Sequence, residues 1–288
     1  MAFDLSGSLS KNQNYPGKIG RHSDFYTGTC IKQGYGLPEV IGIKALRANV
    51  VYKVFTDEFT EKFKKHIDRW VTFDHANFAR CYGYALDCGP MPAIIMDYYP
   101  EGEIMRYMKA KRSSFEEKIN MALADVVEGL CYLHALKPPV VHGDLRAASI
   151  FVTKTGRVVL ADYELGYMIP SRDYTGYVFE EHIGWLAPEL LLEDNPTCTA
   201  ATDAFALAMT IVEMTSNDVP FGSKRNALVL RLRDIYRRPN LPAEVLGCTW
   251  LSVLVQRCWN EEPLARPKAS SIVDIFATNS VTSKLGEE

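Results

Sequence analysis

Two acidic residues lie on either side of a short predicted strand in the middle of this chain. Asp144 belongs to the run VVHGDLRAASIFV at residues 140–152, and Asp162 begins the run DYELGY. Between them, RVVLA at residues 157–161 has the apolar, β-branched character that is typical of a strand. The chain must therefore fold so that this strand leads from one acid-bearing loop to the next, and no other feature constrains the fold as much.

Four short motifs follow one another along the chain. They are VIGIK ending at Lys44, HGDLRAAS at residues 142–149, DYE at residues 162–164 and APE at residues 187–189. These motifs resemble the V-A-I-K, H-R-D-L-x-x-x-N, D-F-G and A-P-E signatures of protein kinases. One such match alone would have little value, but four in the expected order make the chain similar to the protein kinase superfamily.

The resemblance extends over roughly residues 17–277. The forms HGDLRAAS, GWLAPELL and CWNEEPLARP are most similar to those of the tyrosine-kinase-like and tyrosine kinase groups. The resemblance implies that residues 199–214 form a buried helix from which Asp203 binds the backbone of the HGDL loop, and that Arg266 pairs with Glu189. Small-molecule phosphotransferases of the same fold generally lack A-P-E and the later arginine, so they match less well.

The fold implied by this resemblance is the α+β, bilobal protein-kinase fold. A small, antiparallel β-rich N-lobe with one helix is expected over about residues 17–96, and a larger, mostly helical C-lobe over about residues 97–277. The polar residues 1–16 are interpreted as a flexible leader, and residues 278–288 as a frayed tail.

Local patterns predict helices in both lobes. Between Phe59 and Trp70 apolar residues recur at helical spacing, and Thr56 precedes them as a predicted cap. Ser114 and Glu117 form a predicted capping box before an apolar stripe. Further helices are expected near residues 199–215, 224–236, 250–259 and 268–277.

The resemblance implies phosphoryl transfer from ATP with Mg²⁺, which needs a base beside the acceptor hydroxyl, a metal on the phosphates and a cation. Asp144 matches the catalytic aspartate. Asp162 and Ser149 match the two metal ligands, and Lys44 matches the lysine that pairs with the nucleotide phosphates. The remaining positions expected to contact the nucleotide are Gly20, Phe25, Asp97, Tyr99 and Phe151.

Several positions depart from the pattern of active kinases. Gly143 replaces the arginine that contacts a phosphorylated activation segment, and Ser149 replaces asparagine with an oxygen ligand of shorter reach. Glu164 replaces the glycine of D-F-G, which adds a negative charge near the phosphates. Counting back from DHAN at residues 74–77 places His66 where a glutamate normally holds the lysine. A histidine cannot hold an ammonium group in this way.

The phosphate-binding loop departs furthest from the family pattern. It corresponds to IGRHSDFYTG at residues 19–28, where Gly20 alone remains of the three glycines in G-x-G-x-x-G. Phe25 then takes the place of the valine above adenine, and Phe151 that of the leucine below it. The two rings could stack on a base or close the slot by touching one another, and closure is favoured.

These losses predict a pseudokinase-like domain, which acts in signalling by binding protein partners such as an active kinase. ATP and Mg²⁺ would then bind weakly or not at all. The alternative is a low-activity serine/threonine or tyrosine kinase that uses Mg²⁺ and ATP, because Asp144, Asp162 and Lys44 all remain.

Composition argues against several other classes. A net charge of −3 and a pI near 6.1 predict no basic surface for nucleic acid. The N-terminus has no signal-peptide pattern, and the longest apolar run, residues 204–212, is far shorter than the roughly 20 residues that span a bilayer. The seven cysteines include no C-x-x-C pair, and His22, His134 and His182 lack metal-ligand spacing. We therefore expect a reduced, intracellular, cytoplasmic protein without a membrane span.

Overall fold

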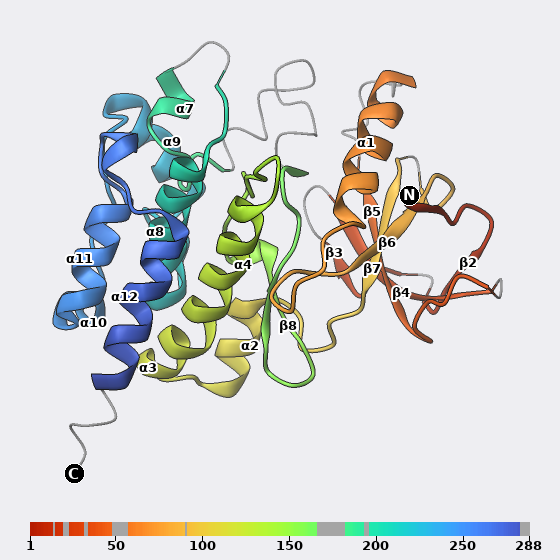
Figure 1. Ribbon diagram of the computed structural model, residues 1–288, viewed down its shortest axis with the longest axis horizontal. Helices are drawn as coiled ribbons and strands as arrows, with labels where there is room; N and C mark the ends of the chain where they lie inside the picture. Colours follow the sequence, from red (N-terminus) through yellow and green to blue (C-terminus); the bar gives the residue numbers. More distant parts are fainter. Residues whose placement is uncertain are drawn as a thin grey trace. The chain divides into compact units, whose positions relative to one another are not determined.

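The computed structural model describes residues 1–13, 15–19, 23–31, 34–47, 57–89, 91–165, 182–192 and 196–282. The chain forms two compact units, Met1–Pro100 and Glu101–Glu288. The first unit is a curled sheet with a helix, and the second is mainly helical (Figure 1). This arrangement confirms the predicted bilobal kinase fold.

A seven-stranded sheet builds the first unit, with the strand order β1-β6-β7-β5-β4-β2 and with β3 paired to β4. All strand pairs are antiparallel except β1 with β6, which is parallel. The strands are β1 (Phe3–Asp4), β2 (Leu9–Lys11), β3 (Lys18–Ile19), β4 (Ser23–Cys30), β5 (Ile41–Leu46), β6 (Cys81–Ala85) and β7 (Ala93–Asp97), and the helix is α1 (Asp57–Trp70).

Strand β5 shows how the sheet separates its two faces. Ile41, Ile43 and Ala45 alternate along the strand and pack in one buried cluster, because successive side chains of a strand point to opposite faces. Gly42 and Lys44 therefore belong to the other face. The core thus fixes the face on which the lysine of VIGIK lies.

The N-terminal residues form part of the sheet, so the prediction of a flexible leader over residues 1–16 is wrong for residues 3–11. Strands β1 and β2 pair with β6 and β4 at opposite ends of the strand order, and the Leu5 side chain between them is fully buried. Gly28 allows the close approach, since a Cβ atom there would lie 2.7 Å from the Ser10 carbonyl oxygen. The polar composition of the segment concealed two apolar residues, Leu5 and Leu9, that pack in the core cluster of the sheet.

The second unit consists of helices and one two-stranded sheet, β8 (Ile150–Val152) with β9 (Val158–Leu160). Its longer helices are α2 (Ile104–Lys111), α4 (Ala124–Ala135), α8 (Ala200–Ser216), α9 (Lys224–Arg233), α11 (Thr249–Cys258) and α12 (Ala269–Thr282). Shorter helical segments are α3 (Phe115–Lys118), the π-helix η1 (Ile119–Leu123), η2 (Ala147–Ser149), α7 (Glu189–Leu192), α10 (Ala243–Gly247) and η3 (Pro263–Ala265).

Helix α8 is the centre of this unit. Every residue from 202 to 215 in this helix is buried, and Thr199 caps its N-terminus by accepting a hydrogen bond from the Thr202 amide. Helix α12 packs along α4 on another side of the unit (Figure 1). The catalytic-loop motif therefore lies on a scaffold whose central helix has no solvent-facing side over most of its length.

The helices predicted from sequence occur close to their expected positions. The capping box is confirmed, because the Ser114 hydroxyl accepts from the Glu117 amide at 3.2 Å while the Glu117 carboxylate accepts from the Ser114 amide at 2.7 Å. Two ends differ from the prediction: α9 stops at Arg233, and α12 continues to Thr282 into the predicted tail. Thr56, the predicted cap of α1, lies outside the described residues. No helix in the described ranges has both the length and the apolar character needed to cross a membrane.

Candidate functional site

Helix α8 holds the backbone of the HGDL loop through the side chain of Asp203. The Asp203 carboxylate accepts hydrogen bonds from the His142 amide at 2.7 Å and from the Gly143 amide at 2.8 Å, and His134 Nε2 lies 2.8 Å from the same carboxylate. The predicted role of Asp203 is therefore confirmed. Gly143 has a φ of 73°, a left-handed conformation that glycine adopts without strain.

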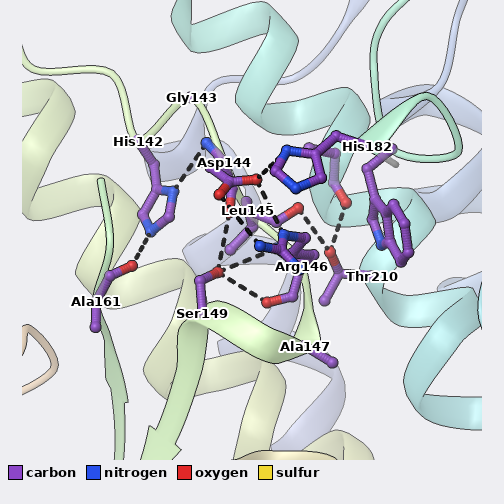
Figure 2. Close-up of polar contacts among 12 residues, drawn as sticks. His142, Gly143, Asp144, Leu145, Arg146, Ala147, Ser149, Ala161, His182 and Thr210 are labelled. Carbon is purple, nitrogen blue, oxygen red and sulfur yellow. Dashed lines mark hydrogen bonds and ion pairs between the residues drawn. The ribbon is translucent and has the colours of Figure 1, made fainter. Parts of the chain in front are cut away.

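His142 links the loop to the end of β9. Its Nε2 lies 2.9 Å from the Ala161 carbonyl oxygen, and its Nδ1 accepts a hydrogen bond from the Asp144 amide (Figure 2). Burial lowers the pKa of His142, although Asp203 and Asp144 favour the protonated form. A neutral ring that donates from Nε2 and accepts at Nδ1 satisfies both contacts, so His142 supports the loop rather than moving protons.

Asp144, the expected catalytic base, is enclosed by two basic side chains. Arg146 Nε lies 3.0 Å and His182 Nδ1 lies 3.2 Å from the same carboxylate oxygen, Asp144 Oδ1. Figure 2 shows both side chains turned toward the carboxylate. Asp144 and His182 are each only 8% exposed. Burial alone would raise the pKa of Asp144, but the charges of Arg146 and His182 outweigh it and hold the pKa below its usual value.

Ser149, the expected second metal ligand, has its hydroxyl inside the loop. The Oγ atom lies 3.0 Å from the Asp144 carbonyl oxygen and 2.8 Å from that of Arg146, and it accepts a hydrogen bond from the Arg146 amide at 3.2 Å. The side chain is fully buried. A hydroxyl has one proton and two lone pairs, so the loop itself uses the proton and one of the lone pairs.

Asp162 and Glu164 lie in a tight turn after β9. Asp162 is buried and Glu164 donates its amide hydrogen to the His142 carbonyl oxygen at 2.6 Å. Both residues have left-handed backbones, with φ of 65° for Asp162 and 52° for Glu164. The turn therefore keeps at Glu164 a conformation that suits glycine, at a cost of about 1–2 kcal/mol for another L-residue.

Oxygen donors suit magnesium, and the fit of this site to Mg²⁺ is partial. Asp162 supplies a carboxylate, whereas the Ser149 hydroxyl retains only one lone pair after its contacts within the loop. No group of three or more His, Cys, Asp or Glu side chains arranged to hold a metal occurs among the described residues. The donor set for a metal ion is thus poorer than the family pattern.

A second acid of α8, Glu213, joins two further segments. Its Oε2 atom accepts from the Ala147 amide and from Trp185 Nε1, both at 2.9 Å. Sequence reasoning missed this residue and also missed the contacts of Arg146 and His182 with Asp144. A lone acid directly after the apolar run 204–212 was the available signal, because an acid in a buried helix needs partners.

The end of the activation segment is fixed as predicted. Arg266 donates two hydrogen bonds to Glu189, from Nη1 at 2.6 Å and from Nη2 at 2.9 Å, and Arg266 is only 6% exposed. Such a two-pronged contact is among the stronger ion pairs in proteins. A small pocket nearby is lined by residues that include Asp144, His182 and Trp185.

The first unit holds the other predicted site residues. Lys44 lies opposite Phe25 of β4 and opposite Ile94 of β7. The Phe25 ring covers Gly42, since a Cβ atom at Gly42 would lie 2.8 Å from the Phe25 Cζ atom. Phe25 thus shares a face of the sheet with Lys44. Gly20 and His22 lie outside the described residues.

Asp97 and Tyr99 follow at the end of β7. The Tyr82 hydroxyl lies 2.5 Å from Asp97 Oδ1, and burial, with the neighbouring Asp97 charge, raises the pKa of Tyr82. Tyr99 is 8% exposed, and burial raises its pKa too. In the second unit Phe151 of β8 is also buried. The structure therefore brings Asp144 and Ser149 into one loop and places Phe25 and Lys44 on one sheet face.

Helix α1 has a histidine at the position expected for glutamate. The His66 ring makes an edge contact with Trp70 at 6.0 Å between centroids. The nearest acids make other contacts, because Asp68 accepts a hydrogen bond from the Ala2 amide at 2.7 Å and Glu61 pairs with Lys64 at 3.2 Å.

Comparison with known proteins gives a consistent result. A family model described as "Protein tyrosine and serine/threonine kinase" matches residues 20–276. The RGS domain-containing serine/threonine-protein kinase A of Dictyostelium discoideum is 26% identical over 233 residues, which make up 78% of this chain and 20% of that protein. Serine/threonine-protein kinase 12 of Arabidopsis thaliana is 24% identical over 226 residues, covering 75% and 47%. Serine/threonine-protein kinase TNNI3K of Mus musculus is 25% identical over 260 residues, covering 88% and 29%. The chain therefore spans less than half the length of each of these relatives.

Proposed function

Since the chain belongs to the protein tyrosine and serine/threonine kinase family, we propose that it is a catalytically impaired member that acts in signalling by binding other proteins. Within the family we assign it to the tyrosine-kinase-like group, on the forms of its HGDLRAAS and CWNEEPLARP motifs. The proposed partners are proteins, such as an active kinase, and the proposed location is the cytoplasm.

The enclosure of Asp144 is the observation that carries this proposal. A general base must come within hydrogen-bond reach of the hydroxyl whose proton it takes. Arg146 and His182 already lie at that distance from Asp144 Oδ1, at 3.0 Å and 3.2 Å. They also hold the pKa of Asp144 low, which reduces its affinity for a proton. An acceptor hydroxyl would find Oδ1 contacted by two basic groups and Oδ2 only 3.5 Å from Arg146 Nη2, and it would meet a weaker base.

Three departures from the family pattern act in the same direction. Ser149 directs its hydroxyl to the loop backbone, Glu164 adds a negative charge two residues after Asp162, and His66 replaces an acid on α1. Removal of one positioned electrostatic contact typically costs about 10²–10³ in turnover, and such losses do not simply multiply. A combined loss of roughly 10⁴ from about 1–100 events per second leaves one event every few minutes to hours. Such a rate is too slow for most signalling.

A second candidate is a slow kinase that transfers phosphate from ATP with Mg²⁺ to serine, threonine or tyrosine. It is favoured by the intact scaffold, because Asp203 holds the loop and Arg266 holds Glu189. Asp144, Asp162 and Lys44 are also retained. The relatives named above are serine/threonine kinases by description, which agrees with this candidate.

Thermal denaturation with ATP, with and without Mg²⁺, separates the two candidates. A ligand that binds the native state must raise the melting temperature. We expect no shift at millimolar ATP in either condition. A shift that requires Mg²⁺ would support the slow kinase and contradict our proposal. Asp162→Asn is the matched control, because it removes the carboxylate expected to hold the metal.

A further inference from the structure

Helix α9 buries a charged side chain and exposes two apolar side chains. Arg231 is fully buried, whereas Leu232 is 72% exposed and Val229 is 41% exposed. A surface helix normally does the opposite, because burial of an apolar side chain is favourable and burial of a charge is costly. The orientation of α9 therefore needs a specific cause.

Contacts of Arg231 supply that cause. Its Nη2 donates to the Leu186 carbonyl oxygen at 2.9 Å, and its guanidinium lies over the Phe205 ring of α8 at 5.6 Å. Ala227, one turn earlier on the same face, is also buried. Burial, together with the nearby Arg238, lowers the pKa of Arg231 to about 10, so the side chain stays charged at neutral pH. These contacts tie α9 to the segment before α7, while the Leu232 side chain stays exposed.

The exposed side of α9 combines apolar and basic side chains. Arg225, Val229, Leu232 and Arg233 are all exposed and lie on one face of the helix, at spacings of four, three and one residues. We name these four residues the α9 outer face. Tyr236, which is 43% exposed, follows shortly after the helix.

Charge around this face is opposite in sign to that of the whole chain. Three basic side chains of residues 224–238 are exposed, those of Arg225, Arg233 and Arg237, against one exposed acid, Asp234, in a chain of net charge −3. Arg237 and Asp234 are exposed beside the end of the helix. An apolar stripe with a basic rim complements a segment that has apolar residues at its centre and carboxylates at its edges.

We propose that the α9 outer face is a docking surface for an acidic, amphipathic segment of a partner protein. This proposal deepens the proposed function, because it rests on the view that the domain works by binding proteins. Apolar side chains of the partner would cover Val229 and Leu232, and its carboxylates would pair with Arg225 and Arg233. Two apolar side chains on a ten-residue helix offer little surface for insertion into a bilayer, which favours a protein over a membrane.

A peptide selection tests the proposal directly. The full chain would be used to select binders from a library of random 14-residue peptides, and enriched peptides would be measured by fluorescence anisotropy. We expect enriched sequences to combine Leu, Ile or Phe with Asp or Glu. Leu232→Asp should weaken their binding by about tenfold or more, because it removes apolar contact at the centre. Arg233→Glu should weaken binding by several-fold and reduce its dependence on salt.

Leu246→Asp is the matched control, since Leu246 is 59% exposed but belongs to α10. Its binding should equal that of the unmodified chain, and circular dichroism should show all three variants folded. Peptides that bind Leu232→Asp as well as the unmodified chain would overturn the proposal. So would a dimer of this chain, or adhesion to anionic phospholipid vesicles, that Leu232→Asp abolishes. Failure of the proposed function would appear separately, as Mg²⁺-dependent stabilisation by ATP in the Leu232→Asp variant and the unmodified chain alike.

Discussion

Helices α8 and α9 both bury charged side chains, but they satisfy them to different degrees. In α8 the Asp203 carboxylate accepts from two backbone amides, and Glu213 Oε2 accepts from an amide and an indole. In α9 Arg231 donates from Nη2, while its Nε and Nη1 atoms have no hydrogen-bond partner in the described part of the chain. Buried charges in α8 therefore organise the catalytic loop, whereas the one in α9 fixes the helix orientation at a cost in stability.

The largest expected effect is the loss of Asp203. Asp203→Ala would leave the buried His142 amide and the part-buried Gly143 amide without an acceptor, so we expect the free energy of unfolding to fall by about 3–5 kcal/mol. Urea denaturation followed by circular dichroism measures the change. Asp218→Ala, at an exposed acid just after α8, is the control and should change stability by less than about 1 kcal/mol. Equal effects of the two variants would refute the anchoring role of Asp203.

Glu213 should show a smaller effect that depends on the replacement. Glu213→Ala removes the acceptor for Ala147 and Trp185, and we expect a loss of about 2–3 kcal/mol in the free energy of unfolding. Glu213→Gln keeps an acceptor oxygen and should lose clearly less. Urea denaturation of both variants measures the two losses. A glutamine variant as unstable as the alanine variant would show that charge, rather than hydrogen bonding, stabilises this position.

The loop should also respond to pH through His142. Its pKa is lowered by burial from the ordinary value of 6.5, so below that pH the unfolded chain binds a proton that the folded chain does not. Stability should therefore decrease as pH falls from about 7 to 5, by at most about 1.4 kcal/mol per pH unit for this proton. Urea denaturation at several pH values measures the slope, and His142→Gln should make it shallower. An unchanged slope in that variant would contradict the neutral, structural role of His142.

Arg231 should give the smallest change in stability. Arg231→Met replaces a partly satisfied charge with an apolar chain of similar length, an exchange that is often neutral or stabilising. We expect the free energy of unfolding to change by less than about 1 kcal/mol, in contrast to Asp203→Ala, and urea denaturation under identical conditions allows the comparison. A loss of unfolding free energy as large as that of Asp203→Ala would show that the buried charge in α9 stabilises the fold as much as those in α8.

Much of the scaffold could be predicted because its signals are local or form fixed motifs. The capping box at Ser114, the backbone contacts of Asp203 and the pair of Arg266 with Glu189 all followed from short patterns and family resemblance. Core positions of α1, such as Phe63 and Trp70, followed from helical spacing.

Contacts between distant segments could not be predicted in the same way. His182 lies 38 residues after Asp144, and no periodicity connects the two positions. The strands at residues 3–4 and 9–11 depend on glycines that lie far along the chain, so a polar segment appeared unstructured. The burial of the Arg231 side chain likewise depends on contacts with Leu186 and Phe205, which lie outside α9.

Transfer of labelled γ-phosphate to a mixed peptide substrate tests the central claim about Asp144 most directly. The unmodified chain and Asp144→Asn would be compared at millimolar Mg²⁺ and ATP. We predict a rate below about 0.01 per second for the unmodified chain, since Arg146 and His182 both contact Oδ1 of the carboxylate that should take the proton and hold its pKa low. A rate of about 1–100 per second that Asp144→Asn abolishes would contradict the account.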